Sequence, residues 1–208
     1  MRTRPMAQRS DVRVTGLVLA AGGSSRLGTA KQLLAYGAVP LLGHVLEVAR
    51  ACGFDQLLCV IGGGADEVRQ KVDFSGVDVV VNERFEEGCS SSIGAALGEV
   101  DEGTDVLVLM LGDQPGVSPR SVGALLDGRG DAALAACRYE DGRGHPLAFG
   151  RSAFTELAAL HGDKGVWKLF DRHGPDVVDV PVSGPIPLDI DSWADYEAAL
   201  AVNDGPDV

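Results

Sequence analysis

The chain has 208 residues, of which 45% are hydrophobic and 23% charged, and its formal net charge at pH 7 is −12. A chain of this size and composition can bury a substantial core as one medium-sized globular domain. The excess of acidic residues argues against nucleic acid as a partner, because nucleic-acid binding depends on clustered Lys and Arg. A phosphate-bearing substrate would therefore need a local positive site, a bound cation, or both.

Through residue 111, short apolar runs alternate with segments of helical periodicity. In chain order we expect a strand at 14–20, a helix at 41–51, a strand at 56–61, a helix at 65–72, a strand at 77–81, a helix at 91–100 and a strand at 105–111. Short buried strands that alternate with helices predict an α/β fold with a mostly parallel sheet and right-handed crossovers.

Beyond about residue 127 the alternation is less regular. We expect strands at 132–136, 146–149 and 177–180, with helices at 152–160, 166–172 and 192–201. We interpret residues 13–202 as one domain, with a nucleotide-binding half at about 13–127 and an acceptor-binding half at about 128–202. The polar segments 1–12 and 203–208 are expected to be tails.

The four cysteines, at positions 52, 59, 89 and 137, show no Cys-x-x-Cys spacing. This distribution favours buried free thiols in a reducing cytoplasm over a zinc site or a disulfide framework. No apolar run is long enough to span a membrane, and residues 1–13 lack the apolar core of a secretory signal. We therefore expect a cytoplasmic protein that does not associate with a membrane.

A loop rich in glycine, Arg and Lys follows the first predicted strand, and ligands of open parallel sheets bind beyond the carboxyl ends of the strands. Gly22 and Gly23 allow backbone N–H groups to approach phosphate oxygens, while Arg26 and Lys31 supply positive charge. The loop has neither Walker A nor G-x-G-x-x-G spacing, so it is not a P-loop or a dinucleotide fingerprint. A flexible surface loop is the alternative.

Carboxylates occupy similar positions farther along the chain. Asp113 follows the most apolar strand and suits a Mg²⁺ ion, although a simple turn aspartate is the alternative. Asp189 and Asp191 alternate in an extended segment, so they point to opposite faces and only one is expected to meet Asp113. The other is expected to face away or to cap the last helix, where Ser192 competes for the cap.

Two further features have alternative interpretations. His145 lies in the glycine-rich segment 142–146, which we expect to be a loop. It either forms structural hydrogen bonds or, together with Arg143, binds a second phosphate. The serine triplet at 90–92 either contacts the nucleotide or caps the helix that follows, and capping requires just one serine.

Five segments, in order, resemble the motifs of nucleotidyltransferases of the molybdenum-cofactor type. They are LAAGGSSRLG at 19–28 followed by KQLL at 31–34, GCSSS at 88–92, GDQP at 112–115, GHP at 144–146 and DID at 189–191. The resemblance runs from about residue 14 to residue 200. The first segment, KQLL and the serines fit the cytidylyltransferase branch, because the guanylyltransferase branch tends to read Leu-Ala-Gly-Gly where this chain has Leu-Ala-Ala-Gly.

The resemblance implies a Rossmann-like three-layer α/β/α fold of the nucleotide-diphospho-sugar transferase type. It also implies Mg²⁺-dependent transfer of CMP from CTP to the phosphate of a pterin cofactor. Catalysis is assigned to Arg26, Lys31 and Asp113, and the metal to Asp113, then Asp191, then Asp189. The implied nucleotide ligands are Leu19, Ala20, Ala21, Gly22, Gly23, Ser24, Ser25, Gly62, Asn82, Ser90, Ser91, Ser92 and Gly112. The implied acceptor ligands are His145, Asp163 and Lys164, close to Trp167, where the family often carries Arg.

Three alternatives stay open. The enzyme could use GTP, or another acceptor such as a sugar phosphate or a phospho-acid, because only the acceptor half distinguishes these activities. It could be an NAD(P)H-dependent oxidoreductase on the same scaffold, although the missing dinucleotide fingerprint argues against this. It could also be a non-catalytic nucleotide-binding chaperone, and a molybdoenzyme client is the protein partner that the resemblance suggests.

Overall fold

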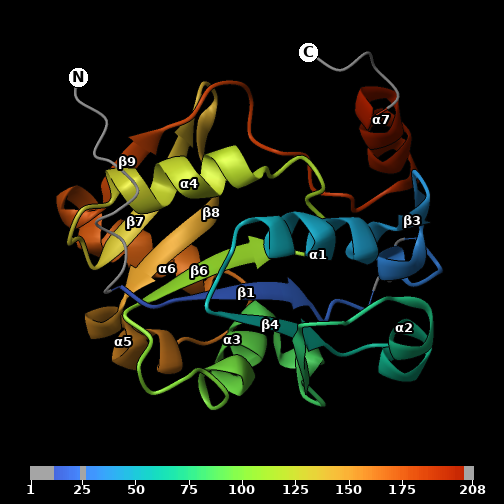
Figure 1. The fold of residues 1–208 in the computed structure, drawn as a ribbon, viewed down its shortest axis with the longest axis horizontal. Coiled ribbons are helices and arrows are strands. Elements are labelled where there is room, and N and C mark those ends of the chain that lie inside the picture. The colour runs from blue at the N-terminus through green and yellow to red at the C-terminus, as the bar shows by residue number, and fades with distance from the viewer. Residues whose placement is uncertain (1–11, 24–26, 204–208) are drawn as a thin grey trace.

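The computed structural model describes residues 12–23 and 27–203, and its centre is a seven-stranded sheet in the order β5-β4-β1-β6-β8-β7-β9 (Figure 1). The strands are β1 (Val14–Ala20), β4 (Gln56–Ile61), β5 (Asp78–Val81), β6 (Val106–Leu111), β7 (Leu134–Tyr139), β8 (Gly142–Gly150) and β9 (Val178–Pro181). Every neighbouring pair is parallel except at β8, which runs antiparallel to β6 and β7. β8 is the exception because Glu140 and Asp141 alone separate it from β7, and so short a connection forms a hairpin.

Helices cover both faces of the sheet, with α1 and α4 on one side and α3 and α5 on the other in Figure 1. One layer contains α1 (Leu41–Ala51), α2 (Ala65–Lys71) and α4 (Pro119–Gly128), and the other contains α3 (Cys89–Leu97), α5 (Phe154–Ala158) and α6 (Gly165–His173). The chain therefore folds into the predicted α/β class, with a mostly parallel sheet between two helical layers.

The last helix, α7 (Trp193–Asn203), lies beside a small hairpin of β2 (Ala35–Tyr36) and β3 (Val39–Pro40). The hydroxyl of Tyr196 donates to the backbone oxygen of Ala35 at 2.5 Å, and Ala199 packs in an apolar cluster with Tyr36. Four short 3-10 helices complete the described elements: η2 (Lys31–Leu33), η3 (Phe85–Glu87), η4 (Arg151–Ala153) and η5 (Gly174–Asp176).

The central strands are apolar at successive positions because both of their faces are covered. In β1, Val18 and Ala20 pack toward the α1 layer, whereas Leu17 and Leu19 pack toward the α3 layer. β6 divides in the same way. A strand buried on both faces has this composition, and the apolar runs in the sequence predicted these two strands within one residue at each end.

Two helices differ from the prediction. α3 begins at Cys89, two residues before the predicted start, so the serine triplet lies inside the helix. α4 was not predicted, although its start carries a recognisable signal. Ser118 accepts a hydrogen bond from the backbone N–H of Ser121, and Pro119 occupies the first helical position.

The expectation that residues 142–145 form a loop is wrong, whereas the strand predicted at 146–149 lies within β8. These residues belong to β8, and His145 and Pro146 are buried. The pairing of β7 with β8 shifts register here, and the two residues form a bulge. A bulge accommodates Pro146, which has no N–H to donate to a neighbouring strand. Glycine and proline, the residues that suggested a loop, are here the residues that a bulged strand end requires.

The four cysteines are free, as predicted: Cys59 and Cys137 are buried, whereas Cys52 and Cys89 are half-buried. Burial raises the pKa of Cys59 and of Cys137 to about 12, so both thiols are protonated at neutral pH. In the part of the chain that the structure describes, no helix combines the length and hydrophobicity that a membrane crossing requires.

The contact between the sheet and α6 can be tested at Phe149. Its side chain is fully buried in β8, and its ring meets that of Phe170 edge-on with 5.7 Å between centroids. We expect Phe149→Ala to lower the free energy of unfolding by roughly 3–5 kcal/mol, because it removes buried area and leaves a cavity. Chemical denaturation measures the change. Val202→Ala, at a site that is 81% exposed, is the control and should cost less than about 0.5 kcal/mol.

Candidate active site

The turns that follow β1, β4 and β6 meet where the carboxyl-terminal ends of these parallel strands lie side by side, which we call the edge of the sheet. Gly112 N–H, after β6, donates to the backbone oxygen of Leu19 at 2.8 Å, and Gly63 N–H, after β4, donates to that of Ala21 at 3.3 Å. A Cβ on Gly112 would lie 2.8 Å from Ala20 Cβ, so this close approach requires glycine. The edge therefore gathers the predicted nucleotide loop and the predicted metal carboxylate.

Lys31 lies between two carboxylates at this edge. Its Nζ donates to Asp113 Oδ2 at 2.5 Å and to Asp191 Oδ1 at 3.0 Å. The side chains of Lys31 and Asp113 are 15% and 18% exposed. Burial alone would lower the pKa of Lys31, but the charge of Asp113 and the hydrogen bonds to both carboxylates raise it above the usual value. Lys31 is therefore a cation across the physiological pH range.

The segment that carries Asp189 and Asp191 is fixed through the residue between them. Ile190 is fully buried, and its N–H donates to the backbone oxygen of Asp113 at 3.1 Å. Asp191 contacts Lys31, whereas Asp189 is exposed. Partial desolvation, and then the charges of Asp113 and Asp191, raise the pKa of Asp189, so all three carboxylates interact at this edge. Which of the pair is the second metal ligand stays a prediction.

The cap of α7 comes from Ser192. Its hydroxyl accepts from Asp195 N–H at 3.3 Å, and Asp195 Oδ2 accepts from the N–H of Ser192 at 2.8 Å. This reciprocal pair is a capping box. Ser192, and not Asp189 or Asp191, therefore caps the last helix.

Two buried glutamines hold the backbone of the site in place, and the sequence patterns gave neither of them a role. Gln32 is 3% exposed, and its Nε2 donates to the backbone oxygens of Ala20 and Gly22 at 2.7 and 3.0 Å. Gln114 Nε2 donates to the backbone oxygen of Pro187 at 3.2 Å, which ties the aspartate segment to the turn after β6. Both glutamines occur inside the motifs, but only tertiary contacts reveal what their amides brace.

The predicted nucleotide loop packs against Phe85, a residue to which the sequence patterns gave no role. A Cβ on Gly62 would lie 2.8 Å from Phe85 Cβ, and one on Gly23 would lie 3.4 Å from the Phe85 ring. Leu19, Ala20 and Ala21 are buried, so they form the base of the loop. Ser24, Ser25 and Arg26 lie outside the described residues, and their roles stay predictions.

Asn82 and the serines form one hydrogen-bonded group beside the loop. Asn82 is 4% exposed, and its Nδ2 donates to Ser91 Oγ at 2.8 Å and to Ser92 Oγ at 3.0 Å. Ser90 Oγ donates to the backbone oxygen of Gly162 at 2.5 Å. No serine side chain caps α3, contrary to one of the two expectations for the triplet. The Cys89 N–H at the start of the helix instead donates to Asp163 Oδ1 at 3.0 Å.

His145 approaches the same edge from the predicted acceptor half, because it lies near the start of β8, beside the end of β6. It is 8% exposed, and its ring meets that of Trp167 at 5.5 Å between centroids. Burial lowers its pKa to about 4, so the imidazole is neutral at pH 7. Arg143 pairs with Asp179 at 2.5 and 3.2 Å. Asp163 and Lys164 are exposed in the turn before α6.

The carboxylates fit a hard divalent cation. Asp113, Asp191 and Asp189 offer only oxygen donors, which suit Mg²⁺ or Mn²⁺. Among residues 12–23 and 27–203, no group of three His, Cys, Asp or Glu side chains is arranged to hold a metal by itself. A cation that takes one or two protein carboxylates and fills its remaining positions with substrate phosphates matches this donor set.

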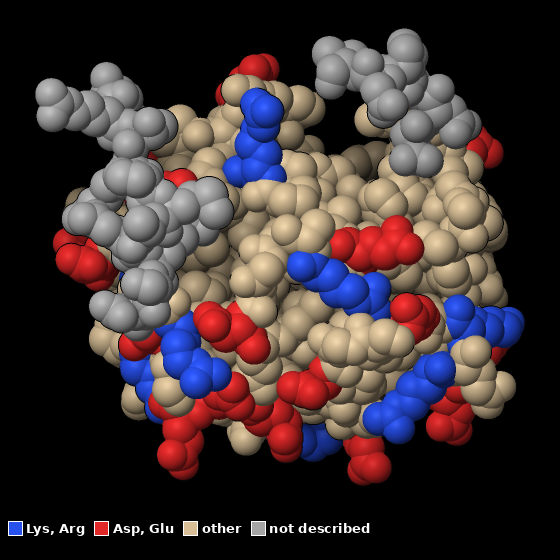
Figure 2. Space-filling model, viewed as in Figure 1, with Lys and Arg blue, Asp and Glu red and all other residues tan. Residues whose placement is uncertain are grey.

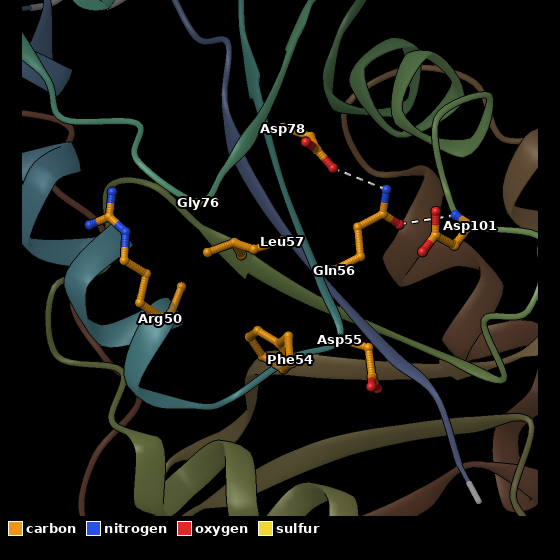
Figure 3. Close-up of a pocket in the computed structure, with 9 residues that line it drawn as sticks. Arg50, Phe54, Asp55, Gln56, Leu57, Gly76, Asp78 and Asp101 are labelled. Atoms are coloured by element: carbon orange, nitrogen blue, oxygen red, sulfur yellow. Dashed lines mark hydrogen bonds between the residues drawn. The ribbon is translucent and has the colours of Figure 1, made fainter.

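A pocket of about 390 Å³ lies elsewhere, at the amino-terminal ends of β4 and β5 (Figure 3). In it Gln56 donates to Asp78 at 3.3 Å and accepts from Asp101 N–H at 3.0 Å. None of the predicted site residues lines it. On the face drawn in Figure 2, the described basic side chains lie singly or beside acidic ones, without the continuous basic surface that nucleic acid needs.

Asp189→Asn tests the crowding of carboxylates. A raised pKa means that folding disfavours the ionised form, so the substitution should stabilise the ligand-free protein at neutral pH. The gain should be small, about 0.5 kcal/mol, because solvent screens this exposed group. It should vanish as the pH falls through the pKa of Asp189, where the wild-type carboxyl becomes neutral. Urea unfolding at several pH values measures it, with Asp176→Asn as the control; a loss of stability at neutral pH would contradict it.

Over most of its length the chain is similar to several known proteins. Nicotine blue oxidoreductase of Paenarthrobacter nicotinovorans is 30% identical over 176 residues, which cover 80% of this chain and 85% of that protein. The crystal structure of the Rv0371c homologue from Mycobacterium sp. strain JC1 superposes with a TM-score of 0.87 at 50% identity, covering 92% of this chain and 96% of that one. Rv0371c of Mycobacterium tuberculosis in complex with manganese gives 0.83 at 45% identity, covering 91% and 99%. The profile of the MobA-like NTP transferase domain matches residues 16–177, and the chain belongs to this family.

Proposed function

We propose that the protein is a Mg²⁺-dependent cytidylyltransferase that transfers CMP from CTP to the phosphate of a molybdopterin-type acceptor and releases pyrophosphate. One observation carries the proposal: Lys31 is held between Asp113 and Asp191 at the edge where the glycine loop ends. A cation, carboxylates and a glycine-rich loop in one place are what a triphosphate and its metal require. The free cysteines accord with the expected cytoplasmic location.

The reaction asks for positioning and charge neutralisation more than for covalent chemistry. An acceptor phosphate oxygen attacks the α-phosphorus of CTP, the bond to the β-phosphate oxygen breaks, and pyrophosphate leaves with the bonding electrons. The acceptor phosphate is ionised at pH 7, so no general base is needed. Backbone N–H groups of the loop would hold the triphosphate, Lys31 would face the α-phosphate, and Arg26 would offset charge on the leaving pyrophosphate.

Asp113 with Asp191, or with Asp189, would hold the divalent cation. The cation would supply charge neutralisation at the phosphates. A structure of Rv0371c, which is 45% identical to this chain, is a complex with manganese, and this supports the use of a divalent metal. The carboxylates already form one electrostatic group, since Asp113 and Asp191 raise the pKa of Asp189.

The acceptor half supports a flat, uncharged ring system. His145 and Trp167 place two rings at the margin of the site, and His145 is neutral at pH 7. Aromatic faces and edges suit a pterin better than they suit a sugar. Lys164, whose side chain is exposed, would bind the acceptor phosphate. We propose a molybdoenzyme as the client that receives the product.

The metal assignment is tested by Asp113→Asn. We expect pyrophosphate release from CTP to fall by ~10²–10³-fold, because a group that neutralises charge in the transition state is lost. Lys31→Ala should reduce turnover to a similar degree. Asp101→Asn is the matched control, because Asp101 lines the pocket at the opposite edge of the sheet. Near-normal turnover of Asp113→Asn would refute the assignment.

The nucleotide is identified by thermal unfolding with CTP, GTP, ATP or UTP, each with and without Mg²⁺. A ligand at a hundred times its Kd stabilises by about 2.7 kcal/mol. We expect a shift with CTP that requires Mg²⁺ and is lost in Asp113→Asn. A shift with another triphosphate alone would support nucleotidyl transfer but refute CTP as the nucleotide substrate.

A second candidate function is favoured by the 30% identity to nicotine blue oxidoreductase, which covers 85% of that protein. This chain would then bind NADPH and transfer hydride to a ring system near His145 and Trp167. The same unfolding measurements with NADPH, together with NADPH oxidation in the presence of a redox dye, distinguish the two. Stabilisation by NADPH that is independent of Mg²⁺, without any response to triphosphates, would replace the transferase proposal.

A further inference from the structure

The first turn of α3 and the turn before α6 are joined by three hydrogen bonds. Cys89 N–H donates to Asp163 Oδ1 at 3.0 Å. Ser90 donates to the backbone oxygen of Gly162 twice, from Oγ at 2.5 Å and from N at 3.3 Å. The partners are more than seventy residues apart in sequence, and they belong to the two halves that the sequence analysis separated.

Two glycines make this junction possible. Gly88 has a φ of 101°, and a Cβ there would lie 2.5 Å from Asp163 Oδ1 and 2.8 Å from its backbone N. A Cβ on Gly165 would collide with Ser90 Oγ. Gly88 lies where Asp163 approaches α3, and Gly165 lies where Ser90 approaches α6. The two turns are therefore closely packed at this junction.

Asp163 takes the place of a local helix cap. The N-cap residue of α3 is Gly88, which has no side chain to accept a hydrogen bond. Ser91 and Ser92 accept from Asn82 instead. A carboxylate at the start of a helix satisfies a free backbone N–H and interacts favourably with the helix dipole. In this fold that carboxylate comes from the acceptor half.

The junction is linked to the proposed active site through Asn82, whose backbone N–H donates to the backbone oxygen of Ile61 at the end of β4. Burial, and then the negative charges of Asp163 and Asp113, raise the pKa of Cys89 to about 11. Figure 1 shows α3 on the same side of the sheet as α5, and both pack with α6 in one core. Through Ser91 and Ser92 the first turn of α3 also holds Asn82 at the end of β5.

We propose that Asp163 is a positioning residue for the nucleotide. It is therefore not the acceptor ligand that the family resemblance implies. Asp163 fixes the first turn of α3, and that turn fixes Asn82 and the serines beside the glycine loop. That Asn82 and the serines bind the nucleotide rests on the proposed function. Loss of the Asp163 hydrogen bond therefore weakens nucleotide binding, although the residue lies in the acceptor half.

Two substitutions at Asp163 separate its hydrogen bond from its charge. Asn keeps the Oδ1 acceptor without the charge, whereas Ala removes both. By titration calorimetry with CTP and Mg²⁺, Asp163→Ala should raise the Kd by about threefold to tenfold, and Asp163→Asn should stay within about twofold. Asp171→Ala, which removes an exposed acid from α6, is the matched control and should leave the Kd unchanged. Lys164→Ala should raise the KM for the acceptor instead.

Alkylation of Cys89 tests the contact itself in the ligand-free protein. Loss of the negative charge should lower the pKa of Cys89, so both Asp163→Ala and Asp163→Asn should speed its reaction with iodoacetamide by about threefold. Cys52, whose pKa is raised to about 11 by burial alone, is the internal reference in the same mass spectrum. Its rate should not change.

The outcomes are distinct. A raised Kd in Asp163→Ala, rescued in Asp163→Asn, with faster Cys89 alkylation in both, supports the proposal. An unchanged Kd in Asp163→Ala with a raised acceptor KM makes Asp163 an acceptor ligand and overturns it. Unchanged Cys89 alkylation in both variants overturns the contact. A wild-type protein that binds no triphosphate refutes the proposed function, while the alkylation rates still decide whether Asp163 holds the first turn of α3.

Discussion

The ammonium group of Lys31 holds together three segments that are far apart in the chain. Its partners Asp113 and Asp191 are 82 and 160 residues away, one after β6 and the other before α7. In a chain with a net charge of −12, carboxylates gathered at one edge of a sheet repel one another unless a cation lies between them. Lys31 provides that cation from the chain itself, and the partial burial of the pair strengthens the attraction.

The geometry around Lys31 carries a cost that has a functional explanation. Asp189 and Asp191 flank a fully buried Ile190, so the backbone fixes them near Asp113 whether or not this suits their charges. Sites shaped for a ligand are commonly less stable than the same chain could be without that task. Under the proposed function, a substrate and its metal would redistribute this charge, and binding would then raise the stability of the fold.

Sequence patterns predicted the fold well where one local signal sufficed. β1 and β6 are apolar runs because both of their faces are buried, and Lys31 and Asp113 were selected because they follow those strands. The pairing of Lys31 with Asp113 depends on how two turns pack, which no local pattern encodes. His145 was misplaced because a bulged strand end and a loop share glycine and proline. The resemblance assigned Asp163 to the acceptor, and no sequence pattern indicated its hydrogen bond to Cys89, 74 residues away.

The direction of β8 has a consequence for how activities diverge on this scaffold. Because β8 is antiparallel to β6, its first residues, not its last, reach the edge where β6 ends. Those residues belong to a hairpin with β7 that contains a bulge, and bulges redirect side chains at the ends of strands. Under the proposed function, this hairpin would recognise the acceptor, while the turns after β1, β4 and β6 would bind the nucleotide. The two specificities would then depend on different segments of the chain and could change separately.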